Sequence, residues 1–184
     1  GRAAMTIEAL VFDAYGTLFD VHAVIARGET FWPGRGAALS QLWRARQLEY
    51  SWQRSLMDRY APFSAVTRDA LDYACEALGL PLDETRVRVL MDEYLNLAAY
   101  PDVPAALEQL KRSGKKLAIL TNGSPDMIEP LVKNRGLEKL FDTVLSVDAV
   151  KIYKPAPRVY MLAVERLGIA AGAIGFVSAN CWDA

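Results

Sequence analysis

Histidine and cysteine are scarce in this sequence, which narrows its possible chemistry. The 184 residues contain one histidine, His22, and two cysteines, Cys75 and Cys181. The two cysteines lie far apart and follow no metal-ligand spacing, so the sequence predicts no cysteine metal site. Reduced thiols are the state expected of cysteines in a cytosolic protein.

Long hydrophobic runs are also missing. No apolar segment approaches the roughly 20 residues that a membrane helix needs. The N-terminal stretch GRAAMTIEAL lacks the hydrophobic core of a secretory signal. We therefore expect a cytoplasmic protein that makes no contact with a membrane.

Neither sign of charge predominates. The 21 basic and 22 acidic residues give a formal net charge of -1, and the basic residues form no dense run. This balance argues against nucleic acid or an anionic membrane as partner and favours a small molecule or another protein. With 52% hydrophobic and 23% charged residues, the chain can bury a core, either as one domain with a sizeable insertion or as two small domains.

Four short apolar runs have the composition of buried parallel strands. The first, IEALVF, ends directly before Asp13 and is rich in β-branched and aromatic residues. Each of the others follows a segment of helical character, so strands and helices alternate. That alternation predicts an α/β fold with a doubly wound, Rossmann-like parallel sheet. The later strands are expected at 116–123, 143–148 and 173–180, and the helices before them at 103–113, 125–134 and 157–167.

The interval 21–100 interrupts this alternation with consecutive helical segments. They are predicted at 36–60, 66–78 and 83–97, and Asp83 is the expected N-cap of the last one. We therefore expect residues 5–20 and 101–184 to form a catalytic core, with residues 21–100 as a helical cap inserted after the first strand. A cap over the carboxyl edge of a sheet is a means of closing an active site.

Polar side chains follow each of the four predicted strands. Ligands of open α/β sheets bind outside the carboxyl ends of the strands, so these side chains are expected to line one crevice. Taken singly, each has a plain structural explanation as an Asx turn, a helix cap or a solvated loop cation. Their joint occurrence at successive strand ends favours a shared site. The residues are Asp13, Thr17, Thr121, Asn122, Lys154, Ser178, Asn180 and Asp183.

Four phrases of the chain resemble the four motifs of the haloacid dehalogenase superfamily. They are FDAYGTLFD, LTNG, YKP and SANCWD, in the family's order and spacing over essentially the whole chain. The cap segment LWRARQLEYSW, with DAYGTLFDVH and KIYKPAPRVY, is most similar to the L-2-haloacid dehalogenases (type II). This resemblance implies hydrolysis of short-chain L-2-haloacids to D-2-hydroxyacids with inversion, through an aspartyl ester on Asp13. It also implies a homodimer.

Tyr15 distinguishes a dehalogenase from a phosphatase of the same superfamily. Such phosphatases typically carry a second Asp two positions after the nucleophile, because an alkoxide leaving group must be protonated. A halide leaves as a stable anion and needs only stabilisation of its charge. With Tyr15 in that position, we expect neither a metal nor another cofactor, and the ammonium of Lys154 takes the electrostatic place of a cation. A histidine-based dehalogenase of the α/β-hydrolase type is not expected, because His22 lies just past the first strand and no GxSxG-like turn occurs.

The resemblance also implies roles for individual residues. Arg44 receives the halide with help from Asn122, although without the resemblance Arg44 would be interpreted as one more solvated charge on its helix. Catalytic roles are implied for Asp13, Thr17, Arg44, Lys154, Ser178, Asn180 and Asp183. Thr17 and Ser178 orient Asp13; Asn180, Lys154 and Asp183 position and activate the water. Substrate contacts are implied for Ala14, Tyr15, Thr121, Asn122, Leu48, Phe63, Tyr160 and Trp182.

Proteins that resemble this chain continue beyond its last motif with a helix and at least one further strand. We therefore expect the C-terminal part of the core to be missing after CWDA. This leaves two alternatives to the dehalogenase hypothesis. One is a phosphatase of the same fold, which Tyr15 disfavours, and the other is an inactive truncated fragment.

Overall fold

A computed structural model describes residues 5–184. Residues 1–4 lie outside the described residues. They are the first part of the N-terminal stretch GRAAMTIEAL, in which no secretory signal was found. At the centre is a parallel sheet with the strand order β3-β2-β1-β4, which confirms the predicted doubly wound arrangement. Its strands are β1 (Ala9–Phe12), β2 (Lys116–Thr121), β3 (Thr143–Ser146) and β4 (Ile174–Val177).

The register of the sheet brings the strand ends to one edge. Phe12 at the end of β1 pairs with Ile119 of β2 and with Val177, the last residue of β4. The backbone N–H of Asp13 donates to the carbonyl of Val177 at 2.9 Å. The residues that follow β1 and β4 therefore leave the sheet side by side.

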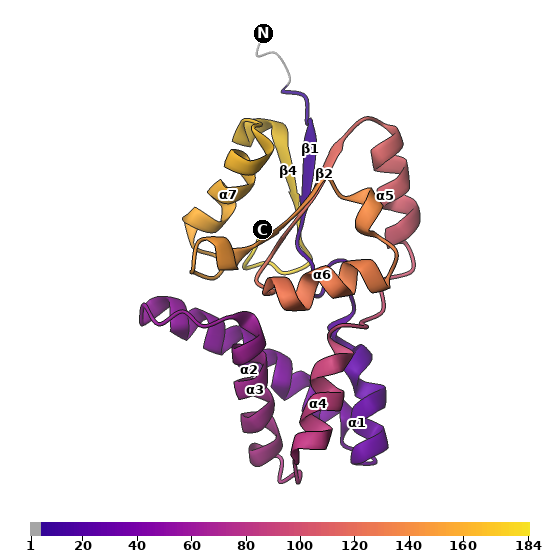
Figure 1. Cartoon of the computed structure of the whole chain (residues 1–184), viewed down its shortest axis with the longest axis vertical. Coiled ribbons are helices and arrows are strands. Elements are labelled where there is room, and N and C mark those ends of the chain that lie inside the picture. Colours follow the sequence, from indigo (N-terminus) through magenta and orange to yellow (C-terminus); the bar gives the residue numbers. More distant parts are fainter. Residues whose placement is uncertain (1–4) are drawn as a thin grey trace.

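Helices cover both faces of the sheet. Helix α5 (Val103–Arg112) and helix α7 (Pro157–Leu167) lie on opposite sides of it, and α6 (Pro125–Asn134) lies near its carboxyl edge (Figure 1). The bounds of α6 and α7 are those expected from the sequence. Pro125 and Pro157 each occupy the first turn, where the missing backbone N–H is not needed.

Residues 21–100 form consecutive helices joined by loops, as predicted, and lie beyond the carboxyl edge of the sheet (Figure 1). The helices are α1 (Ile25–Phe31), α2 (Gly36–Leu56), α3 (Phe63–Ala77) and α4 (Glu84–Glu93), with a short 3-10 turn at Val21–Val24. The Asp83 side chain accepts from the N–H of Arg86 at 2.8 Å, which confirms the expected N-cap of α4.

The helix predictions in this segment were wrong in detail. Helix α1 was not predicted as a separate helix, and α4 ends at Glu93 rather than at residue 97. Helix α2 ends at Leu56 rather than at residue 60, because Asp58 adopts a left-handed backbone with φ 53°. Helix α3 begins at Phe63, directly after Pro62 in an extended conformation. Among residues 5–184, no helix is both long and apolar enough to cross a membrane.

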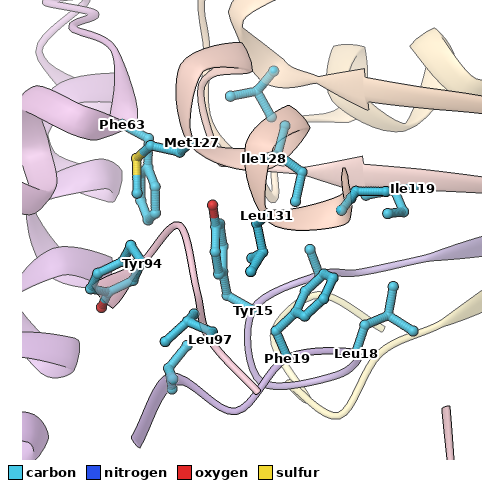
Figure 2. Packing of buried hydrophobic residues seen from close by; sticks show 14 of the residues in the cluster. Tyr15, Leu18, Phe19, Phe63, Tyr94, Leu97, Ile119, Met127, Ile128 and Leu131 are labelled. Carbon is cyan, nitrogen blue, oxygen red and sulfur yellow. The ribbon is translucent and has the colours of Figure 1, made fainter. Parts of the chain in front are cut away.

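Tyr15 lies in the buried contact between the α1–α4 segment and the sheet. Its ring stacks on Phe63 with centroids 5.9 Å apart and meets Tyr94 edge-on at 5.9 Å. Leu131 of α6 lies on the other side of the ring (Figure 2). The same segment is held to the core by the hydroxyl of Tyr60, which donates to Asp148 at 2.7 Å.

Candidate active site

The carboxylate of Asp13 is the centre of the polar site. Asp13 follows β1 directly and is 5% exposed. Its Oδ2 accepts hydrogen bonds from Thr17 Oγ1 at 3.0 Å, Ser178 Oγ at 2.9 Å and Asn180 Nδ2 at 2.7 Å. The loops after β1 and β4 thus supply three donors to one oxygen and fix the plane of the carboxyl group.

Lys154 supplies the positive charge beside this carboxylate. Its Nζ lies 3.2 Å from Asp13 Oδ1 and 2.8 Å from Asp183 Oδ2, and the lysine is 1% exposed. Burial by itself raises the pKa of Asp13. The charge of Lys154 and the hydrogen bonds from Asn180 and Ser178 outweigh burial, so the pKa lies below its ordinary value of 3.8. Asp13 is therefore ionised at neutral pH.

Asp183 is the second buried carboxylate of the site. Besides Lys154, it accepts a hydrogen bond from the hydroxyl of Tyr160 at 2.6 Å. Burial and this contact with Asp183 raise the pKa of Tyr160, which keeps the phenol protonated as a donor. The hydroxyl of Tyr160 thus binds Asp183 in this structure, and its expected contact with the substrate stays a prediction.

Two further predicted residues follow β2. Thr121 is buried, and its Oγ1 accepts from the N–H of Gly123 at 3.0 Å; the hydroxyl keeps its own proton to donate. Asn122 Oδ1 accepts from the backbone N–H of Lys154 at 3.0 Å. This bond joins the loop after β2 to the loop that carries the lysine.

The backbone N–H of Ala14 donates to Oδ1 of the neighbouring Asp13 at 2.8 Å. The side-chain amide of Asn180 donates to Asp13 and to the carbonyl of Tyr15, the latter at 3.3 Å. The expected contacts of Ala14 with the substrate and of Asn180 with the hydrolytic water stay predictions.

Arg44 extends from α2 toward the loop after β1. Its Nη2 donates to the carbonyl of Tyr15 at 3.3 Å, and its Nη1 donates to Oε1 of Gln47 at 3.0 Å. Burial is the largest influence on this guanidinium and lowers its pKa below the ordinary value of 12.5. The sequence did not single out Gln47, although its spacing of three residues after Arg44 places it on the same helix face.

The apolar residues expected to line the substrate pocket lie in different surroundings. Leu48, one turn after Arg44 on α2, is partly exposed, and the ring of Trp182 packs edge-on against Trp52 at 5.4 Å. Phe63 is 1% exposed and is part of the core. The ring of Tyr15 lies there too, with its hydroxyl buried and without a hydrogen-bond partner, so only its backbone reaches the polar site.

A metal ion needs several ligand side chains close together. Within residues 5–184, the structure brings no three His, Cys, Asp or Glu side chains into such a group. The cation that the structure places between Asp13 and Asp183 is the ammonium of Lys154.

Comparison with known proteins identifies the family. The model of the haloacid dehalogenase-like hydrolases matches residues 7–184. The chain belongs to this family. It is 53% identical over 178 residues to the (S)-2-haloacid dehalogenase of Pseudomonas sp. (strain YL), covering 97% of this chain and 77% of that protein. It is 50% identical over 178 residues to (S)-2-haloacid dehalogenase H-109 of Pseudomonas putida, covering 97% and 80%.

A solved structure of another haloacid dehalogenase is similar throughout. It is the L-2-haloacid dehalogenase from Xanthobacter autotrophicus with chloropropionic acid covalently bound. This chain superposes on it with a TM-score of 0.92 at 48% identity, covering 97% of this chain and 72% of the other. The predicted superfamily and fold are therefore confirmed.

Proposed function

We propose that this haloacid dehalogenase-like hydrolase converts short-chain L-2-haloacids to D-2-hydroxyacids through an aspartyl ester on Asp13. The observation that carries the proposal is the buried carboxylate of Asp13, which Lys154 holds in the ionised form. Tyr15, whose ring is part of the core, takes the position at which a phosphatase needs an acid. The two Pseudomonas relatives, both (S)-2-haloacid dehalogenases, and the covalent adduct in the Xanthobacter structure support the same reaction class.

In the first half-reaction, Asp13 attacks C2 of the haloacid from the side opposite the halogen. A carbon–oxygen bond forms, the carbon–halogen bond breaks, and the halide leaves with the electron pair while C2 inverts. Thr17, Ser178 and Asn180 hold the carboxylate for in-line attack. Arg44 and Asn122 stabilise the departing halide, for which a weakly hydrated guanidinium is well suited.

In the second half-reaction, water attacks the carbonyl carbon of the ester and not the substrate carbon. Asp183 accepts one proton of the water, and the bond between Cγ of Asp13 and the former Asp13 oxygen, now attached to C2, breaks. The alkoxide takes up the second proton of the water and leaves as the hydroxyacid, and Asp183 returns its proton to solvent, so the inversion at C2 is retained and Asp13 is regenerated with the oxygen of the water. Lys154 and Tyr160 hold Asp183 in place for this step.

The substrate carboxylate needs donors close to Asp13. In this proposal the hydroxyl of Thr121 and the backbone amide of Tyr15 hold it, and the amide of Ala14 assists after leaving Asp13. Leu48, Phe63 and Trp182 enclose the apolar end of the substrate. Phe63 takes part only if the α1–α4 segment moves relative to the sheet.

The proposed reaction assigns a separate role to each of two parts of the chain. Residues 5–20 and 101–184 act as the catalytic core and residues 21–100 as the cap that brings Arg44 over Asp13. The proposal includes no metal and no other cofactor, because Lys154 lies between the two carboxylates. It also includes a cytoplasmic homodimer. The two free cysteines agree with a reducing compartment.

Chloride release from L- and D-2-chloropropionate tests the proposal directly. The purified chain is assayed with and without EDTA, beside Asp13→Asn as the control. Release from the L isomer alone, insensitive to EDTA and absent in the control, is the expected result. EDTA-sensitive hydrolysis of a phosphoester without chloride release would favour a phosphatase, and no turnover of either substrate class would favour an inactive fragment.

A further inference from the structure

Arg44 is partly buried, and its guanidinium has no acidic hydrogen-bond partner. Among the described residues 5–184, it forms no salt bridge, and its hydrogen-bond acceptors are the carbonyl of Tyr15 and the amide oxygen of Gln47. Buried arginines are ordinarily paired with carboxylates, because an unpaired charge loses its hydration. Arg44 therefore keeps a positive charge that nothing on the protein neutralises by direct contact.

Gln47 is fixed from both ends of its amide group. Its Oε1 accepts from Arg44 Nη1 at 3.0 Å, and its Nε2 donates to Oγ1 of Thr67 on α3 at 2.9 Å. Gln47 is 0% exposed, and so is Thr67. The guanidinium of Arg44 can only donate, so the amide oxygen must face Arg44, and the NH2 group is then left to donate to Thr67.

We infer that Gln47 is a positioning residue that holds Arg44 over the site with a neutral acceptor and so leaves its charge available to the departing halide. This inference rests on the proposed function, in which Arg44 receives the halide. A glutamate of the same size at residue 47 would also hold Arg44. It would, however, pair with the guanidinium and compete with the halide for it.

The surroundings of Arg44 agree with this division of roles. The ring of Tyr94 packs against the rings of Tyr15 and Trp43, and burial raises the pKa of its phenol to about 12. At neutral pH this phenol is uncharged. The acceptors that Gln47 and Tyr15 offer to Arg44 are thus neutral, and the carboxylate of Asp13 acts on the guanidinium without a hydrogen bond to it.

The Gln47→Glu variant tests the inference by exchanging the amide for a carboxylate of equal shape. The hydroxyl of Thr67 can rotate to donate to it, so the fold has a route to keep both bonds. Bromide binding is measured by titration calorimetry at constant ionic strength, together with kcat for L-2-chloropropionate and L-2-bromopropionate. Gln109→Glu, an exposed residue of α5, is the matched control for the same change in net charge.

We expect Gln47→Glu to weaken bromide binding by about tenfold or more while its melting temperature stays close to that of the control. We also expect kcat to fall further for the chloride than for the bromide substrate, because chloride is the poorer leaving group and depends more on Arg44. A merely structural role of Gln47 would lower both kcat values by the same factor and leave bromide binding unchanged.

Three results would overturn the inference in distinguishable ways. Unchanged bromide affinity in a folded Gln47→Glu variant rejects only the role of Gln47 and leaves the halide-binding role of Arg44 intact. A wild-type chain that releases chloride from substrate but does not bind bromide rejects Arg44 as an open halide site and leaves the proposed function intact. A chain that does neither rejects both. If Gln47→Glu does not fold, Gln47→Met removes both hydrogen bonds without adding charge, and unchanged bromide affinity there also rejects the inference.

Discussion

Replacing Lys154 by methionine removes one ammonium and keeps the length and most of the volume of the side chain. The change leaves Asp13 and Asp183 as two buried carboxylates, 5% and 4% exposed, without the cation between them. Removing one partner of a buried ion pair costs about 3–5 kcal/mol. At roughly 2–4 °C per kcal/mol for a chain of this size, the melting temperature should fall by roughly 6–20 °C near neutral pH.

The dependence of this loss on pH follows from Asp13. In the wild type the pKa of Asp13 is lowered below 3.8, so its contribution to stability is present above pH 3.8 and is lost as the pH falls through the folded-state pKa. In Lys154→Met, burial dominates and raises this pKa above the unfolded value. The variant is then destabilised above pH 3.8 and regains stability as acidification protonates the carboxyl group, so its deficit relative to the wild type shrinks at lower pH.

Thermal unfolding followed by circular dichroism at pH 7.5 and at pH 5 measures both effects. Lys133→Met, at an exposed position of α6, is the control and should change the melting temperature by less than about 2 °C. A Lys154→Met variant that unfolds at the wild-type temperature, or whose deficit is the same at both pH values, would refute the claim that the ammonium holds Asp13 ionised.

Three further substitutions probe the surroundings of Asp13. Ser178→Ala removes one of the three donors to Oδ2, and we expect a loss of about 1 kcal/mol in urea unfolding at neutral pH and a lower kcat; equal stability would contradict this. Gly123→Ala places a Cβ 2.7 Å from the hydroxyl of Tyr15, and the overpacking should cost about 1–3 kcal/mol in the same assay; an unchanged midpoint would show that the ring yields freely. Tyr160→Phe releases Asp183 from its 2.6 Å hydrogen bond and should slow hydrolysis of the ester, so mass spectrometry should find the ester on Asp13 accumulating during turnover. A slower reaction without accumulated ester would place Tyr160 in the first half-reaction.

Much of the fold follows from local patterns in the sequence. The apolar runs before Asp13 and Thr121 predicted buried parallel strands because their composition excludes a half-exposed strand. Prolines at the first turns of α6 and α7 set their bounds. The end of α2 was missed because the apolar pattern continues past Leu56, whereas the left-handed backbone of Asp58 is not encoded by that pattern.

The arrangement of the site was only partly predictable. The alternation of strands and helices predicted a parallel sheet whose carboxyl ends meet at one edge, whereas the pairing of β1 with β4, which places Asp13 and Ser178 side by side, was not predicted. The hydrogen bond between Tyr160 and Asp183 joins α7 to the loop after β4. It depends on how these two elements pack, which the residues around Tyr160 do not predict. The role of Gln47 depends on Thr67 of another helix, so spacing along α2 alone shows only that it shares a face with Arg44.

The central claim is that Asp13 attacks carbon and that water then attacks Asp13. A single turnover of L-2-chloropropionate with excess enzyme in heavy-oxygen water tests it most directly. The account predicts that the hydroxyacid carries ordinary oxygen and that the peptide containing Asp13 gains one heavy oxygen. Heavy oxygen in the hydroxyacid and none in that peptide would mean that water attacks the substrate directly, and would contradict the account.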